Sequence, residues 1–132
     1  MSDPIRNPAH YTAYPVQPIE IARHLGFCLG NAVKYVIRAP FKGGVEDCDK
    51  ALQYLKWERE QSGVYVEEQP VDIGEVMHPL VLYLQDMNTP VAGHQETFLR
   101  FLLSYVVFGH GPSLKEMEKE VRGLKRALEA RP

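Results

Sequence analysis

Residues 30–58 read GNAVKYVIRAPFKGGVEDCDKALQYLKWE, and this stretch decides the fold. Its first part alternates two kinds of side chain at helical spacing. The polar residues are Asn31, Lys34, Tyr35 and Arg38, and the apolar ones are Leu29, Val33, Val36 and Ile37. Because a helix turns about 100° per residue, each set shares one arc, and the two arcs are opposite. The pattern predicts an amphipathic helix over residues 29–39.

The second part of the stretch repeats this pattern and predicts a helix over residues 45–61. Its polar stripe is Asp47, Lys50, Tyr54 and Glu58, and its apolar arc is Cys48, Leu52 and Leu55. A short connection containing Pro40 and Gly43-Gly44 joins the two helices, which favours an antiparallel hairpin. The two polar stripes would then face one another. Such an arrangement suits a phosphate-bearing ligand.

The rest of the chain also reads as helical, with four proline residues in an N-terminal arm over residues 1–18. We predict helices over 19–25, stopped by Gly26, and over 73–87, where Pro79 should kink or restart the helix. A further helix begins at Thr89-Pro90 and is buried over 94–108, and the last begins at a capping box of Ser113 and Glu116. Residues 64–70 read as a brief extended piece or a linker.

The predicted fold class is therefore all-α, a small helical bundle with an extended, proline-rich N-terminal arm. We divide the chain into a helical region over 1–63, which carries the two polar stripes, and a C-terminal helical region over 64–132, packed with it as one domain or used for oligomerisation. The last helix carries an apolar seam at 3-4 spacing. It consists of Leu114, Met117, Val121, Leu124 and Leu128. Packing on the preceding helix and self-association both remain open for this seam.

Composition limits the classes of function. The chain has 132 residues and a net charge of -2, so we expect no bulk electrostatic binding of nucleic acid. The two cysteine residues, Cys28 and Cys48, form no metal-ligand or disulfide motif, and we interpret them as reduced and partly buried. The longest apolar run, residues 98–108, is interrupted by Arg100 and is shorter than the ~20 residues of a membrane span. We therefore expect a cytoplasmic protein that has no signal peptide and no membrane contact.

The first half of the chain resembles a small phage and prophage family of unknown function. The family pattern contains Asn-Pro-x-His-Tyr, Ile-Glu, Gly-Asn-x-x-Lys-Tyr-x-x-Arg, Lys-Gly-Gly and Glu-Asp-x-x-Lys-Ala-x-x-Tyr-Leu. The residues that match are Asn7, Pro8, His10, Tyr11, Ile19, Glu20, Gly30, Asn31, Lys34, Tyr35, Arg38, Lys42, Gly43, Gly44, Glu46, Asp47, Lys50, Ala51, Tyr54 and Leu55. The family includes an oligomeric deoxynucleoside monophosphate kinase of a lytic coliphage, which has no P-loop. The resemblance covers about residues 5–60 and implies nucleotide binding in the cytoplasm of the host cell by a homo-oligomer.

Phosphoryl transfer needs cations and hydrogen-bond donors that hold the two reactants in line. We predict catalytic roles for His10 as proton shuttle or phosphate donor, for Arg38 as bidentate phosphate clamp, and for Lys50 as a point charge. The predicted ligand-binding residues are Asn31, Lys34, Tyr35, Lys42, Gly43, Gly44, Asp47 and Tyr54. From the sequence alone, Arg38→Ala should abolish nucleotide binding without unfolding the protein.

Two other classes of function remain open. The first is an all-α nucleotide pyrophosphohydrolase, which would hold Mg²⁺ on paired acidic residues. Glu46 with Asp49 and Glu116 with Glu120 are imperfect versions of such pairs, and Mg²⁺ could also accompany a bound nucleotide. The second is a non-enzymatic phage accessory protein that binds a host protein or nucleic acid. We assign no metal-ligating residue, since the remaining histidine residues have no companions at ligand spacing.

Overall fold

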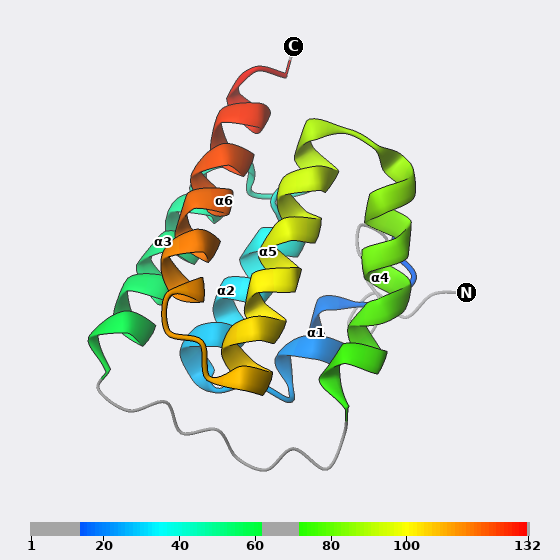
Figure 1. The fold of residues 1–132 in the computed structure, drawn as a ribbon. Coiled ribbons are helices and arrows are strands. Elements are labelled where there is room, and N and C mark those ends of the chain that lie inside the picture. The colour runs from blue at the N-terminus through cyan, green and yellow to red at the C-terminus, as the bar shows by residue number, and fades with distance from the viewer. Residues whose placement is uncertain (1–13, 62–71, 132) are drawn as a thin grey trace.

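The computed structural model describes residues 14–61 and 72–131, which form six helices and no strand (Figure 1). The all-α prediction is confirmed for these residues. The predicted arm as far as residue 13 and the predicted extended piece over 64–70 lie outside them. The helices are α1 (Pro18–Ala22), α2 (Phe27–Arg38), α3 (Gly44–Glu60), α4 (Ile73–Met87), α5 (Pro90–Phe108) and α6 (Ser113–Glu129).

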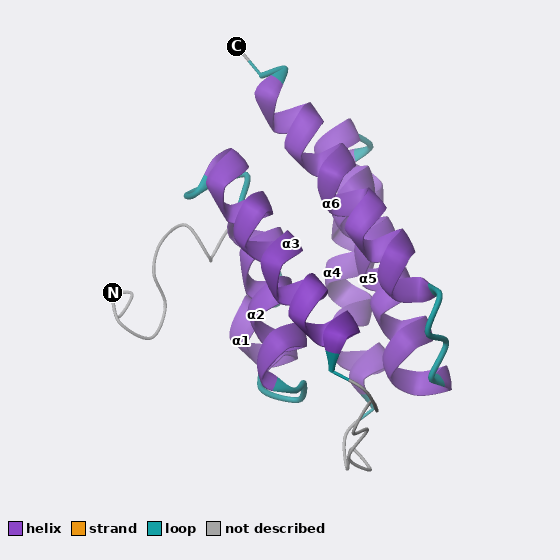
Figure 2. Ribbon diagram, turned by 90° about the vertical axis from the view of Figure 1, so that its left-hand side faces the viewer, coloured by secondary structure: helices purple, strands orange, loops and turns teal. Residues whose placement is uncertain are grey.

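Helix α5 lies at the centre of the bundle, with α6 packed along one side and α4 along the other. Helix α3 packs against both α6 and α2, so the α2–α3 hairpin forms an outer wall of the molecule (Figure 2). Helix α1 packs on α2 and touches α4. All six helices contribute side chains to one apolar core. The division at residue 63 stays a prediction.

The apolar seam of α6 lies in this core. Leu114, Met117, Val121 and Leu124 are buried, Leu128 is partly buried, and the helix packs on α5 and α3. The seam therefore packs within the chain, as the first of the two alternatives predicts. Whether the protein forms a homo-oligomer stays a prediction.

The predicted stop of the first helix at Gly26 is wrong. Helix α1 ends at Ala22, and Gly26 instead precedes α2 as its N-cap, with an extended backbone whose carbonyl oxygen accepts from the amide of Gly30 at 2.8 Å. Glycine is among the residues that favour an N-cap, because its backbone leaves the helical region at little cost. As a result α2 begins at Phe27, two residues earlier than predicted.

The predicted restart of the helix at Pro79 is also wrong, since α4 runs as one helix from Ile73 to Met87, whereas a kink there stays a prediction. Pro79 itself is exposed, while the apolar stripe of α4 is buried on both sides of it, including Met77 and Leu80. Packing of both halves on the bundle core keeps the helix continuous despite the hydrogen bond that proline removes. Asp72 caps the start of this helix as predicted, because its side chain accepts from the amide of Gly74.

The predicted capping box of Ser113 and Glu116 is absent from α6. The N-cap is Pro112, and no side-chain bond caps the helix. Ser113 is buried, and its hydroxyl oxygen lies 2.8 Å from Nδ1 of His110. The Ser113 hydroxyl therefore interacts with His110 in the preceding turn and does not cap α6. The start of α5 at Thr89-Pro90 is confirmed, with the Thr89 hydroxyl accepting from the amide of Ala92.

Gly123 on α6 leaves room for the ring of His94 on α5. A Cβ at position 123 would lie 2.4–2.9 Å from three atoms of that ring, which also holds Glu120 through Nδ1 at 2.8 Å. In an ordinary helix, Gly→Ala stabilises by about 1 kcal/mol. We expect Gly123→Ala to bring no such stabilisation to the wild-type protein, because the ring of His94 must move. In a His94→Ala background the same substitution should stabilise by the ordinary amount.

Urea unfolding of the four proteins checks this expectation, since the difference between the two backgrounds gives the coupling between positions 94 and 123. The expected coupling is about 1 kcal/mol or more. Equal effects of Gly123→Ala in both backgrounds would contradict the packing described here.

Candidate functional site

The turn between α2 and α3 brings the two polar stripes together. The amides of Phe41 and Lys42 donate to the carbonyl of Arg38, and the amide of Gly44 donates to the carbonyl of Ala39. Gly44 has φ +55°, a left-handed conformation that glycine adopts without steric cost. This tight return places α2 and α3 side by side, and the predicted hairpin is confirmed (Figure 2).

The centre of the two stripes is a pair of stacked tyrosine rings. Tyr35 and Tyr54 have ring centroids 5.9 Å apart and an angle of 16° between their planes. Three cations surround the Tyr35 ring: Nζ of Lys34 at 4.4 Å, Cζ of Arg38 at 5.2 Å and Nζ of Lys50 at 5.4 Å from its centroid. Attraction between each cation and the ring helps to hold these like charges close to one another.

We call this surface the basic–aromatic face. It consists of Asn31, Lys34, Tyr35, Arg38, Lys50 and Tyr54. All six were predicted as site residues, and the structure brings them together. Their role toward a ligand stays a prediction.

Asn31 orients Lys34 within the face. Its side-chain amide donates to the carbonyl of Phe27 at 2.8 Å, and its carbonyl oxygen accepts from Nζ of Lys34 at 3.2 Å. Both ends of the Asn31 side chain are thus engaged, and the lysine is held beside the Tyr35 ring. The amide nitrogen keeps a second N–H and the oxygen a second lone pair, so both can still meet a ligand, and the predicted ligand-binding role of Asn31 stays a prediction.

Asp47 has a position that its sequence pattern does not reveal. Its side chain is 1% exposed, and Oδ2 accepts from Nε of Arg38 at 2.9 Å. Oδ1 has no hydrogen-bond partner in the part of the chain that the structure describes. The carboxylate therefore lies beneath the face and holds the arginine in place. This geometry favours a positioning role over direct ligand contact.

Gly43 makes room for that carboxylate. A Cβ at position 43 would lie 1.9, 2.0 and 2.2 Å from Cγ, Oδ1 and Oδ2 of Asp47. This packing alone explains why position 43 is glycine, independently of its predicted role in ligand binding. Lys42 is exposed in the turn, next to the start of α3. Contact of Lys42, Gly43 or Gly44 with a phosphate stays a prediction.

The sequence pattern placed Glu58 in the polar stripe of α3, and this prediction is wrong. Glu58 is buried, and its Oε2 accepts from the hydroxyl of Tyr105 on α5 at 2.9 Å. The stripe instead continues with Trp57, whose ring lies 5.4 Å from that of Tyr54. On the antiparallel helix α2 it continues toward the same end of the hairpin with Phe27, whose ring lies 5.8 Å from that of Tyr54.

We call Phe27 and Trp57 the aromatic extension of the face. Phe27 is 75% exposed and Trp57 is 45% exposed. Sequence analysis missed both, because large aromatic side chains usually lie in a core. The signal was present in the spacing, since Phe27 precedes Asn31 by four positions and Trp57 follows Tyr54 by three.

Three of the acidic residues that the sequence suggested for Mg²⁺ pair with separate basic side chains. Glu46 pairs with Lys50 at 3.5 Å, and Asp49 pairs across to Lys125 of α6 at 2.9 Å. Glu120 pairs with His94. Within residues 14–61 and 72–131, no group of three or more His, Cys, Asp or Glu side chains could hold a metal ion. The predicted acidic pairs of a pyrophosphohydrolase therefore do not converge in this part of the chain.

The two cysteine residues are free and buried. Burial is the main cause that raises the pKa of the Cys48 thiol to about 12, and nearby Asp49 and Asp47 raise it further. Burial also raises the pKa of Cys28. Both thiols are protonated at neutral pH and are poor nucleophiles, in agreement with their interpretation as structural residues.

The predicted catalytic residue His10 lies outside the described residues, so its role stays a prediction.

The match to a known family covers the face. Residues 5–56 match DUF3310, a family described as being of unknown function. The matched stretch is less than half of the chain, but it spans α1, α2 and most of α3, and so contains all six residues of the basic–aromatic face. No curated protein matches the chain. No solved structure matches it either.

Among the described helices, none is long and apolar enough to cross a membrane.

Proposed function

We propose that the basic–aromatic face binds a nucleotide and that the protein is a nucleoside monophosphate kinase of the phage type. The observation that carries the proposal is the gathering of three cations around one ring of a stacked tyrosine pair. A nucleotide combines a planar base with a charged phosphate. The face offers a partner for each, at a distance that one small ligand can span.

The cations have different capabilities toward a phosphate. Arg38 presents a planar guanidinium that suits bidentate contact, while Lys34 and Lys50 act as mobile point charges. Arg38 is anchored through Nε by Asp47, so binding costs less conformational entropy at this side chain than at a free one. Tyr35 and Tyr54 are half-buried and rigid, which suits stacking of a base.

In the proposed reaction, an oxygen of the deoxynucleoside monophosphate attacks the γ-phosphorus of a nucleoside triphosphate. The bond from that phosphorus to the bridging oxygen breaks, and the products are two nucleoside diphosphates. Such a transition state needs positioning and charge neutralisation more than covalent help. Lys34, Arg38 and Lys50 would supply the charge, and His10 is the candidate for moving a proton.

The hydrolase alternative has less support. Its chemistry needs convergent carboxylates for Mg²⁺, whereas Glu46, Asp49 and Glu120 each pair with a different basic side chain. The accessory-protein alternative predicts that no nucleotide binds at all, and the experiment below separates it from the proposal.

A thermal-shift panel of nucleoside mono-, di- and triphosphates, each with and without Mg²⁺, tests binding. A ligand that binds only the folded state raises the melting temperature by mass action. Lys50→Ala removes one cation of the face and is expected to weaken binding about tenfold, as for loss of one charge-assisted contact. Lys56→Ala is the matched control, because this exposed lysine of α3 pairs with Glu60 outside the face.

The same proteins are then assayed for transfer of the γ-phosphate of ATP to each deoxynucleoside monophosphate. The proposal expects diphosphate products from both reactants, and loss of rate in Lys50→Ala but not in Lys56→Ala. Release of pyrophosphate would point to the hydrolase. A flat thermal panel at millimolar ligand would favour the accessory protein.

A further inference from the structure

We propose that the basic–aromatic face, together with its aromatic extension, binds a short single-stranded oligonucleotide of about four or five nucleotides. This inference rests on the proposed function, because it uses the same cations and the same stacked tyrosine pair. It goes further in naming a strand as a ligand. The extra contacts come from Phe27 and Trp57, which a mononucleotide on the cations leaves unused.

Four aromatic rings form one connected set along the hairpin. Tyr54 lies at its centre, stacked on Tyr35 at 5.9 Å and in edge contact with Phe27 at 5.8 Å and with Trp57 at 5.4 Å. Proteins that bind single strands combine such rings, on which successive bases stack, with cations that follow the backbone. The three cations beside Tyr35 provide the second element.

The length of the stripe matches a strand better than one nucleotide. Phe27 and Arg38 are the first and last residues of α2, so the stripe runs roughly 16 Å along that helix at 1.5 Å per residue. At a stacked rise of about 3.4 Å per nucleotide, this length corresponds to four or five nucleotides. Cations lie toward the turn and exposed rings toward the other end of the hairpin.

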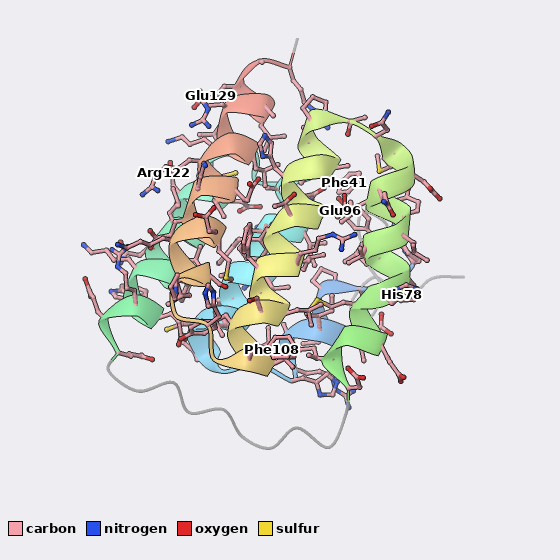
Figure 3. All side chains as sticks on the ribbon, viewed as in Figure 1. Phe41, His78, Glu96, Phe108, Arg122 and Glu129 are labelled. Atoms are coloured by element: carbon pink, nitrogen blue, oxygen red, sulfur yellow. The ribbon has the colours of Figure 1, made fainter. Side chains whose placement is uncertain are left out.

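The chemistry of the exposed residues favours bases over a protein partner. Both exposed apolar residues of the extension are aromatic. The exposed aliphatic residues lie on other helices, namely Ile19 on α1, Leu82 and Met87 on α4, and Val107 on α5. Val107 precedes Phe108, which projects from the far end of α5 (Figure 3). In the described part of the hairpin no large aliphatic side chain is exposed, whereas a groove for a peptide usually offers such side chains.

Trp57 is the single tryptophan of the chain and reports directly on the extension. Its fluorescence is recorded while the full chain is titrated with dTMP, with the pentanucleotide dT5 and with dA5. We expect both pentanucleotides to quench Trp57 and to bind at least tenfold more tightly than dTMP. The affinity for dT5 should fall with salt at a log–log slope of roughly -2, as for three phosphates neutralised on a single strand.

Phe27→Ala is the deciding variant, because the side chain is 75% exposed and its removal should leave the fold intact. We expect it to weaken dT5 binding about tenfold, the usual effect of removing one stacking ring, and to change dTMP binding less than twofold. Phe108→Ala, which removes an exposed ring on α5, is the matched control and should change neither.

The outcomes separate this inference from the proposed function. If dTMP and dT5 bind equally well, or if Phe27→Ala leaves the advantage of dT5 unchanged, the strand inference is overturned and the nucleotide site stands. If dT5 binds with the expected loss in Phe27→Ala but dTMP does not bind, the strand inference stands and the kinase proposal fails. If neither ligand binds, both are overturned.

Discussion

Arg38→Ala is expected to lower the free energy of unfolding by about 3–5 kcal/mol, the usual cost of removing one partner of a buried ion pair. Asp47 is 1% exposed, and its Oδ2 accepts a hydrogen bond from Nε of Arg38 at 2.9 Å. The other oxygen, Oδ1, already has no partner among the described residues. Without the guanidinium, the carboxylate would remain buried and uncompensated.

Urea unfolding of four proteins measures this effect: wild type, Arg38→Ala, Asp47→Asn and the double variant. The double variant should be more stable than Arg38→Ala alone, because a neutral amide costs less to bury than an unpaired charge. Lys50→Ala is the matched control, since it removes a cation of the same face that is 43% exposed. An Arg38→Ala variant as stable as Lys50→Ala would show that the buried pair contributes nothing.

The same geometry changes the expectation drawn from the sequence, in which Arg38→Ala removes binding and leaves the fold intact. Loss of binding in this variant would combine a lost phosphate contact with a damaged fold. Lys34 and Lys50 are therefore the better probes of the nucleotide site, because neither holds a buried charge.

Spacing along the hairpin was sufficient to predict most of its structure. The apolar residues of the first predicted helix, Leu29, Val33, Val36 and Ile37, are all buried in α2. Gly26 and Pro79 were misjudged for a common reason. Each has a local effect on the backbone that the sequence shows, while its consequence depends on what packs around it. Local preference is a weak guide where tertiary packing decides.

The candidate site, like the fold, was predictable where helical spacing decides the arrangement and unpredictable where tertiary packing decides it. Helical periodicity predicted that the six residues of the basic–aromatic face share one surface, since this follows from spacing alone. It could not predict that Asp47 lies beneath the surface, because its burial depends on the missing Cβ of Gly43 across the turn. Glu58 was misplaced for a similar reason, since its partner Tyr105 lies 47 residues away in the sequence.

Gly43→Ala is expected to destabilise the protein by about 2 kcal/mol and to weaken ligand binding with it. The new Cβ would overlap all three carboxyl atoms of Asp47, so the carboxylate must move and its bond to Arg38 must lengthen or break. Overpacking of this kind costs about 1–3 kcal/mol. Backbone strain adds nothing, because Gly43 has φ -92° and ψ -14°, which alanine adopts freely.

Two comparisons isolate the overlap as the cause. Gly44→Ala tests backbone strain by itself, since φ is +55° there and no atom lies within 4 Å of the added Cβ. It should cost about 1 kcal/mol. In an Asp47→Ala background, Gly43→Ala should cost nothing or stabilise slightly, because the carboxylate is gone and the unfolded chain loses entropy. A cost that persists in that background would mean that Gly43 serves the turn itself, and that Arg38 does not depend on it for its position.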